Sequence, residues 1–143
     1  MNRPTRCPFC AILGGEAPAS LVCEDAHAVA FMDLRQAVPG HVLVVPRRHV
    51  ETIFELDGDT AAALMRMAVR VAQAAERAFA PAGLNLWQSN REAGGQEVPH
   101  LHLHVQPRRV GDGLLRVYPG AVPAPAARRD LDGLAVELRA RLD

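Results

Sequence analysis

Three histidines at every second position are the residues in this chain whose spacing most strongly suggests chemistry. They and the residues that separate them are His100, Leu101, His102, Leu103, His104 and Val105. Because side chains alternate between the two faces of a β-strand, the spacing predicts a strand with imidazoles on one face and apolar side chains on the other. Successive histidines would lie about 6.6–7 Å apart, too far for all three to chelate one metal ion. Such a row suits an extended anionic substrate.

The elements that must position these histidines are readable from the pattern upstream. Apolar, β-branched runs predict strands, and apolar residues at helical spacing, followed by Pro81 and Gly83, predict one long helix. A Gly-rich loop leads into the histidine strand. The predicted elements are strands at 27–34, 39–49 and 83–89, the helix at 59–79, and the loop at 91–97. Strands on both sides of one helix favour an α+β fold with an antiparallel sheet.

The end of the chain has a different character. Residues 119–127 are rich in Pro and Ala and predict an extended arm, and leucines at helical spacing predict a short helix over 128–142. No segment within 1–118 has the composition of a linker. We therefore expect one domain over 1–118, with 119–143 as an arm and helix of the same globule.

Composition excludes several classes of protein. The 143 residues carry 16 Lys and Arg against 16 Asp and Glu, so neither nucleic acid nor a membrane is expected as partner. There is no run of about 18 apolar residues and no signal-like segment, which predicts a cytoplasmic protein. Three cysteines do not form a disulfide framework; Cys7 and Cys10 form a CxxC motif, and Cys23 is interpreted as a packing residue.

The histidine run and the GGQEV segment before it (94–98) resemble the histidine triad (HIT) family of nucleotide hydrolases and transferases, in particular its Hint-like bacterial branch. FMDLRQAVPGHVLVVPRRH (31–49) is similar to the family's other binding segment, and the resemblance covers residues 7 to 109. It implies a HIT-like fold with a long and a short helix. It also implies a homodimer whose sheet continues across both subunits.

The resemblance implies a role for each histidine in hydrolysis. His102 would attack the α-phosphate of a purine (AMP-containing) nucleotide, a phosphoramidate or a dinucleoside polyphosphate, and water would hydrolyse the nucleotidyl-histidine. A neutral imidazole is a competent nucleophile near pH 7, which makes this chemistry reasonable. His104 and Gln96 would contact the phosphate, and His41 would lie beside the nucleophile.

The same resemblance assigns further residues to nucleotide binding. Asp33 and Leu34 match positions that hold ribose and base. Backbone N–H groups around Gly95 and Glu97 would join Gln96 at the phosphate. Either Ser89 or Asn90 would meet the phosphate, because relatives often carry an amide residue where this chain has Ser89. Glu97 replaces a hydroxyl residue of some relatives, which could alter substrate preference.

The CxxC motif also fits the family. Some members hold a structural zinc ion with such a motif, a later histidine and the first histidine of the triad. Here the ligands would be Cys7, Cys10, His49 and His100, a set suited to tetrahedral zinc. No cofactor is expected for catalysis.

Other functions remain open on sequence alone. A transferase or phosphorylase of the superfamily would carry glutamine in place of His104, and Gln106 lies two positions too late. A nucleotide-binding regulatory protein with vestigial hydrolysis, and a histidine-rich metalloenzyme, are alternatives of other classes. Base preference and leaving group stay undetermined.

Overall fold

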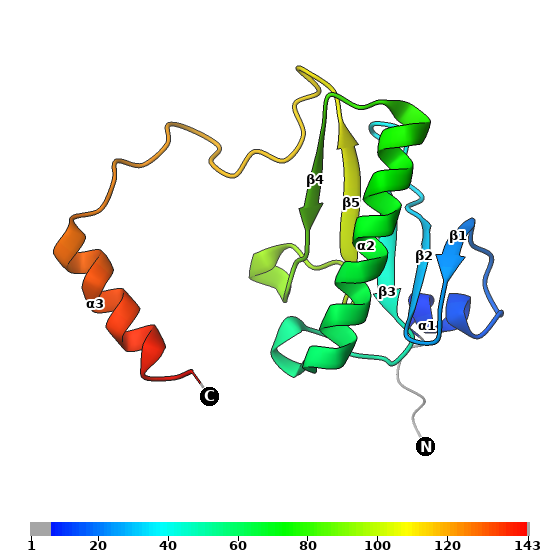
Figure 1. The fold of residues 1–143 in the computed structure, drawn as a ribbon, viewed down its shortest axis with the longest axis horizontal. Helices are drawn as coiled ribbons and strands as arrows, with labels where there is room; N and C mark the ends of the chain where they lie inside the picture. The colour runs from blue at the N-terminus through cyan, green and yellow to red at the C-terminus, as the bar shows by residue number, and fades with distance from the viewer. Residues whose placement is uncertain (1–6, 143) are drawn as a thin grey trace. The chain divides into compact units, whose positions relative to one another are not determined.

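A five-stranded antiparallel sheet is the frame of the fold (Figure 1). The structure is a computed structural model and describes residues 7–142. The strands stand in the order β1-β2-β3-β5-β4. Their bounds are β1 (Leu21–Glu24), β2 (Ala28–Met32), β3 (Val42–Pro46), β4 (Gly83–Trp87) and β5 (Leu103–Arg108). The α+β class with an antiparallel sheet is therefore confirmed.

The two strands β2 and β3 form the centre of the hydrophobic core. Their sequences, AVAFM and VLVVP, are apolar at every position, and all but Met32 are buried. A strand that is apolar on both faces needs cover on both sides. Its even and odd residues accordingly contact different layers of the protein.

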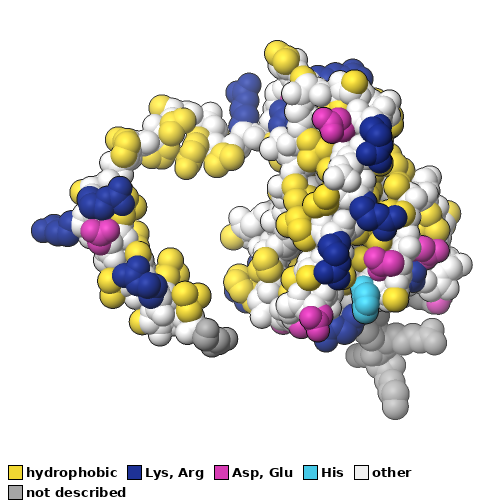
Figure 2. All heavy atoms as spheres, in the orientation of Figure 1, with side chains coloured by type: hydrophobic (Ala, Val, Ile, Leu, Met, Phe, Trp, Pro, Cys, Tyr) yellow, Lys and Arg dark blue, Asp and Glu magenta, His cyan; other side chains and the backbone are white. Residues whose placement is uncertain are grey.

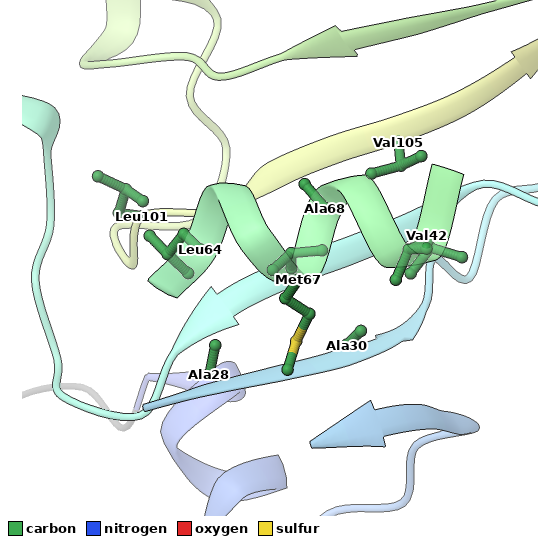
Figure 3. Packing of buried hydrophobic residues seen from close by; sticks show 10 residues of the cluster. Ala28, Ala30, Val42, Leu64, Met67, Ala68, Leu101 and Val105 are labelled. Atoms are coloured by element: carbon green, nitrogen blue, oxygen red, sulfur yellow. The ribbon is translucent and has the colours of Figure 1, made fainter. Parts of the chain in front are cut away.

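The long helix α2 (Gly58–Phe79) supplies the cover on one face. Asp57 caps its N-terminus by accepting a hydrogen bond from the N–H of Thr60, and Ala80 ends it in the left-handed conformation at φ 41°. Figure 3 shows Leu64, Met67 and Ala68 of this helix against the sheet. The residues that they meet in the sheet and in the segment before β5 include Ala28, Ala30, Val42, Leu101 and Val105. The predicted helix and its buried face are confirmed, although Phe79 is half exposed.

A short helix, α1 (Pro8–Leu13), supplies cover on the other face. Its Phe9 packs with Val29, Phe31, Leu43 and Val45, which alternate with the residues that face α2. The sequence prediction missed both α1 and β1. Two 3-10 helices, η1 (Ile53–Glu55) and η2 (Glu92–Gly94), complete this part of the chain.

The predicted histidine strand begins later than its spacing suggested. Only His104 belongs to β5; His100 and His102 precede it, with the N–H of Leu101 bonded to the carbonyl of Val50. Pro99 suggested a strand start or an edge, and neither is correct, because β5 starts at Leu103 and lies between β3 and β4. The N–H of His100 instead bonds to Val98, which turns the chain before it enters the sheet.

The turn between β2 and β3 is held by a glycine and a glutamine. Gly40 has φ +108°, and a Cβ on it would lie 2.8 Å from the Phe79 ring, so no larger residue fits. Gln36 donates to the carbonyls of Asp33 and His41 and accepts from the N–H groups of Gly40 and His41. These bonds fix where His41 enters the sheet.

The described residues divide into two units, the first ending at Asp112 and the second beginning at Gly113. The second unit contains α3 (Arg128–Arg139), shorter than the predicted helix, with Leu134 and Leu138 exposed. The prediction that residues 119–143 belong to the same globule stays untested. Within the described residues, no helix has the length and hydropathy needed to span a bilayer.

Candidate active site

A cavity of about 700 Å³ opens at the face of the sheet that carries α1. Most of the residues assigned from the sequence line it: Asp33, Leu34, His41, Ser89, Gly95, Glu97, His102 and His104. Asn90 and Gln96 do not. The structure thus brings together residues from the β2–β3 turn, the end of β4 and the loop before β5.

His102 is buried in this cavity with a defined tautomer. Its Nδ1 lies 2.6 Å from the carbonyl oxygen of His100. A carbonyl only accepts, so Nδ1 carries the proton and Nε2 keeps its lone pair. Burial lowers the pKa of His102 below 6.5, although the bond to His100 acts in the opposite direction. The Phe9 ring meets the imidazole edge-on, with centroids 5.1 Å apart. His102 is therefore a neutral, fixed imidazole at neutral pH.

His104 and His41 form a second pair of imidazoles beside it. The Nε2 of His41 and the Nδ1 of His104 are 2.9 Å apart. The Nδ1 of His41 lies 3.4 Å from the carbonyl of Arg35 and 3.8 Å from the Asp33 carboxylate. Both groups accept, so His41 carries its proton on Nδ1 and accepts at Nε2 from His104. Trp87 stacks on His104 at 4.2 Å, with the two planes 2° apart.

The rim of the cavity is formed by charged and exposed side chains. Asp33 is half-buried and accepts a hydrogen bond from the N–H of Arg35 at 2.7 Å. Leu34 is 99% exposed, so none of residues 7–142 covers it. The guanidinium of Arg35 pairs with the carboxylate of Glu97 at 3.2 Å. This ion pair links the β2–β3 turn to the loop before the histidines.

The amides of Gln96 and Asn90 are used within the fold. The Oε1 of Gln96 accepts from the N–H of Arg91, and its Nε2 donates to the carbonyls of Glu51 and Val98. The Oδ1 of Asn90 accepts from the N–H of Ile53. Both side chains shape the loop in this structure, and Ser89 is the one of the pair Ser89/Asn90 that lines the cavity.

A second cluster brings together the four predicted zinc ligands. The ligand atoms of Cys7, Cys10, His49 and His100 all lie within 4.8 Å of one another. The Sγ of Cys7 is 3.4 Å from the Nδ1 of His100, and the Sγ of Cys10 is 3.3 Å from the Nδ1 of His49. The Nε2 of His100 donates to the carbonyl of Pro46 at 2.9 Å, so its Nδ1 faces the sulfurs unprotonated. Two sulfurs and two imidazole nitrogens fit tetrahedral zinc.

His100 connects the cluster of Cys7, Cys10, His49 and His100, called the cysteine cluster below, to the histidines of the cavity. His100 contributes its ring to the cysteine cluster and its carbonyl to His102. Burial raises the pKa of the Cys10 thiol, and the hydrogen bond and charge of Cys7 add to this. A bound cation would favour the thiolates and hold α1, with its Phe9, against His102.

Three site residues were missed by the sequence analysis. Trp87 stacks on His104, Phe9 packs on His102, and Arg35 pairs with Glu97. Trp87 could have been found, because it ends the strand that precedes the histidines and stands opposite His104 in the β4–β5 register. Phe9 lies inside the CPFC motif itself.

The burial of His104 leads to a prediction about stability. Burial, followed by the charges of His102 and His41, lowers its pKa from 6.5 to about 4. Between pH 6.5 and pH 4, His104 is protonated in the unfolded chain but neutral in the folded chain. The free energy of unfolding is therefore unaffected by this histidine above pH 6.5 and decreases as the pH falls toward 4. From pH 7 to pH 5, the free energy of unfolding of wild type should fall by about 1–2 kcal/mol more than that of His104→Asn. Urea unfolding of both proteins at the two pH values measures this difference; equal losses would contradict it.

The comparisons with known proteins agree with this geometry. The family model described as "HIT domain" matches residues 14–111. "Protein hit" of Bacillus subtilis is 38% identical over 119 residues, which cover 82% of either chain. "Adenosine 5'-monophosphoramidase hnt1" of Schizosaccharomyces pombe is 31% identical over 102 residues, covering 71% of this chain and 74% of that one.

Solved structures share the whole fold. A HIT family protein from Bacillus anthracis matches with a TM-score of 0.88 and 32% identity over 99% of this chain and 100% of that chain. A zinc-bound histidine triad family protein from Mycobacterium smegmatis matches with a TM-score of 0.71 and 31% identity, covering 95% and 97% of the two chains.

Proposed function

We propose, since the chain belongs to the HIT domain family, that it hydrolyses purine nucleoside phosphoramidates at the α-phosphate through a nucleotidyl-histidine. The observation that carries the proposal is the tautomer of His102, whose Nδ1 is bonded to the His100 carbonyl and whose Nε2 is left with a lone pair. The phosphoramidase among the relatives supports the choice of a nitrogen leaving group.

In the first step, the Nε2 lone pair of His102 attacks the α-phosphorus. A bond forms between Nε2 and phosphorus as the bond from phosphorus to the leaving nitrogen breaks. The leaving amine keeps the electron pair and takes up a proton from solvent. Because His102 is already neutral and oriented, no separate base has to activate it.

In the second step, water attacks the same phosphorus. The bond between phosphorus and Nε2 breaks, the electron pair returns to the imidazole, and the water loses a proton to solvent. The products are the nucleoside monophosphate and the regenerated His102.

His41 and His104 together stabilise the negative charge on the phosphate. In the free protein the Nε2 of His104 is unprotonated, because its Nδ1 donates to His41. An anionic phosphate oxygen beside this Nε2 favours the protonated imidazole, which makes it a donor. Trp87 keeps the ring in place.

The apolar half of the cavity suits the base. Its wall includes Ile12, Pro18, Phe31 and Leu43, and Asp33 stands at its edge as an acceptor for ribose hydroxyls. The N–H of Gly95 is bonded to the carbonyl of Glu92 at 2.9 Å, so the N–H of Glu97 remains the candidate for a further phosphate contact.

The cysteine cluster would hold a structural zinc ion. Cys7, Cys10, His49 and His100 fill a tetrahedral shell, so the bound ion supplies folding free energy and not a position for water. The residues around it keep the His100 carbonyl directed at His102.

A dimer is predicted through the β4 edge of the sheet. Leu84 and Leu86 of β4 are partly exposed, as are Met65 and Val69 of α2. Leu86 pairs with Val105, which faces α2, so Leu86 lies on the face of the sheet that α2 covers. Figure 2 shows this face, with hydrophobic side chains beside the arginines of α2.

Light scattering should give twice the chain mass of 15.5 kDa, and Leu86→Glu should shift the mass toward one chain. A wild-type monomer at micromolar concentration contradicts the prediction.

A substrate panel tests the proposed activity. Adenosine 5'-phosphoramidate and diadenosine polyphosphates are compared at equal concentration, with release of AMP as the readout. The proposal expects the phosphoramidate to be hydrolysed with the higher kcat/KM. Faster cleavage of the polyphosphates would move the protein to the other hydrolase class. Binding of AMP without any turnover would identify a nucleotide-binding protein.

A further inference from the structure

Trp87 is the single tryptophan of the chain, and it lies against two histidines of the active site. The ring centroids of Trp87 and His104 are 4.2 Å apart with planes 2° from parallel, and the His41 ring lies 5.5 Å away at a tilt of 35°. Trp87 is half-buried and lines the active-site cavity. An aliphatic side chain of similar bulk at the end of β4 could also hold the His104 ring, so the aromatic face needs a reason of its own.

The charge of His104 differs between the free protein and the nucleotide complex described above. In the free protein, burial, followed by the charges of His102 and His41, lowers the pKa of His104 to about 4, so its ring is neutral at neutral pH. A phosphate oxygen beside Nε2 favours the protonated ring, and solvent supplies the proton. The ring on which Trp87 stacks therefore becomes a cation when phosphate binds.

The titratable and charged groups that face His104 act on this cation in opposite directions. His41, which directly precedes β3, and His102, which precedes β5, both oppose a positive charge on His104, and Asp33 of the β2–β3 turn favours it. Asp33 also lies 3.8 Å from the Nδ1 of His41, so its charge acts on both rings. A further group that attracts the imidazolium is needed on the β4 side, where Trp87 stands opposite His104.

The stacked geometry suits a cation. The face of an indole is electron-rich and attracts a cation within about 6 Å of its centre. His104 is inside this distance in the free protein, so the imidazolium can form without movement of either ring. A carboxylate in the same place would also attract the imidazolium but would repel the phosphate, whereas an indole carries no net charge.

We propose that Trp87 is a positioning residue whose indole face stabilises the imidazolium of His104 that forms when an anionic phosphate binds. This role goes beyond holding the ring in place. It rests on the phosphate contact of His104 in the proposed function, and it makes His104 a donor to phosphate at a pH at which burial alone would keep the ring neutral.

Fluorinated tryptophan tests the indole face without changing its shape. Because Trp87 is the single tryptophan, growth on 5-fluorotryptophan or a difluorotryptophan replaces this residue alone, and fluorine withdraws electron density from the face. The pKa of His104 in the AMP complex, read from the ring ¹⁵N resonances of the full chain and assigned with His104→Asn, should fall with each added fluorine. A pKa that does not depend on fluorination overturns the proposal.

Trp87→Leu and Trp87→Phe give the second test. Loss of the face in Trp87→Leu should lower the pKa of His104 in the AMP complex by about 0.5–1, and Trp87→Phe, which keeps a face, should lower it less. If Trp87 only shielded the ring, the sign would be opposite, because a smaller side chain admits water and hydration raises the pKa of a buried imidazole. A raised or unchanged pKa in Trp87→Leu therefore overturns the proposal.

Kinetics with adenosine 5'-phosphoramidate complete the test. Trp87→Leu should reduce kcat/KM about fivefold, and Trp87→Phe should restore it to within about twofold of wild type. The matched control is Asn85→Ala, because Asn85 lies two residues earlier on the same face of β4 and does not line the active-site cavity; its kcat/KM should equal that of wild type. Equal losses in Trp87→Leu and Trp87→Phe overturn the role of the face.

The two proposals fail in different ways. A protein that binds AMP with a fluorination-dependent pKa at His104 but hydrolyses no phosphoramidate supports the role of Trp87 and overturns the proposed function. Hydrolysis whose rate and His104 pKa are both independent of fluorination supports the proposed function and overturns the role of Trp87.

Discussion

His102→Ala should lose about 10³-fold or more in turnover of adenosine phosphoramidate. Removing the imidazole removes the atom that bonds to phosphorus. His104 also has an unprotonated Nε2 beside the cavity, but the proposal places it at the phosphate oxygens, so it does not replace His102. Binding of AMP should change little, because the donors to phosphate and the apolar wall remain. Single-turnover kinetics and calorimetry with AMP separate these two quantities.

The matched control is His27→Ala. His27 is exposed and does not line the active-site cavity, so its loss should leave kcat unchanged. His104→Ala should cost about 10²–10³-fold, the usual effect of losing one donor to a developing negative charge. The wild-type kcat/KM should decrease on the acid side with a midpoint below pH 6.5, because burial lowers the pKa of His102.

The intermediate gives the sharpest outcome. Phosphorus–nitrogen bonds of histidine are acid-labile, so the reaction is stopped by rapid alkaline denaturation and the peptides are analysed by mass spectrometry. The nucleotidyl group should be found on His102. An adduct on His104, or full activity in His102→Ala, would refute the mechanism.

The zinc site should produce the largest effect on stability. Elemental analysis should find about one zinc ion per chain, and Cys7→Ser should release it and lower the melting temperature by about 10 °C or more, which corresponds to a few kcal/mol for a domain of this size. The cluster joins α1 to residues at 49 and 100, so its loss frees the N-terminal segment from the sheet.

Cys23→Ser is the control for this experiment. Cys23 is also half-buried but lies outside the cluster, so zinc content should stay at one and the melting temperature should fall less. Zinc that is retained by Cys7→Ser and lost on substitution of His104 would place the metal in the histidine cavity instead. That result contradicts both the assignment and the proposed role of His104.

Local patterns were sufficient for the fold class. The continuous apolar runs of β2 and β3 and the helical spacing in α2 are patterns among neighbours within a few positions, and the structure has these elements close to their predicted bounds. The histidine alternation likewise indicated which side chains share a face. The alternation did not predict where the strand starts. The N–H of Leu101 bonds to the carbonyl of Val50, about 50 residues earlier, and a local pattern cannot reveal such a partner.

The ligand and site assignments that came from the resemblance group residues that lie far apart in the sequence. Nothing local in the sequence joins Cys7 to His100, 93 residues later. That contact exists because β3 and β5 pair and α1 packs on the opposite face from α2. The pairing of β4 with β5 places Trp87 on His104.

What the sequence by itself determined is therefore the set of reactive side chains and the elements that carry them. Only the tertiary structure decided how those side chains are used. It fixed the tautomer of His102 through the His100 carbonyl, turned Gln96 toward the loop backbone, and stacked Trp87 on His104. Each depends on the direction of a side chain relative to a distant backbone group, and residue type and spacing carry no information about that direction.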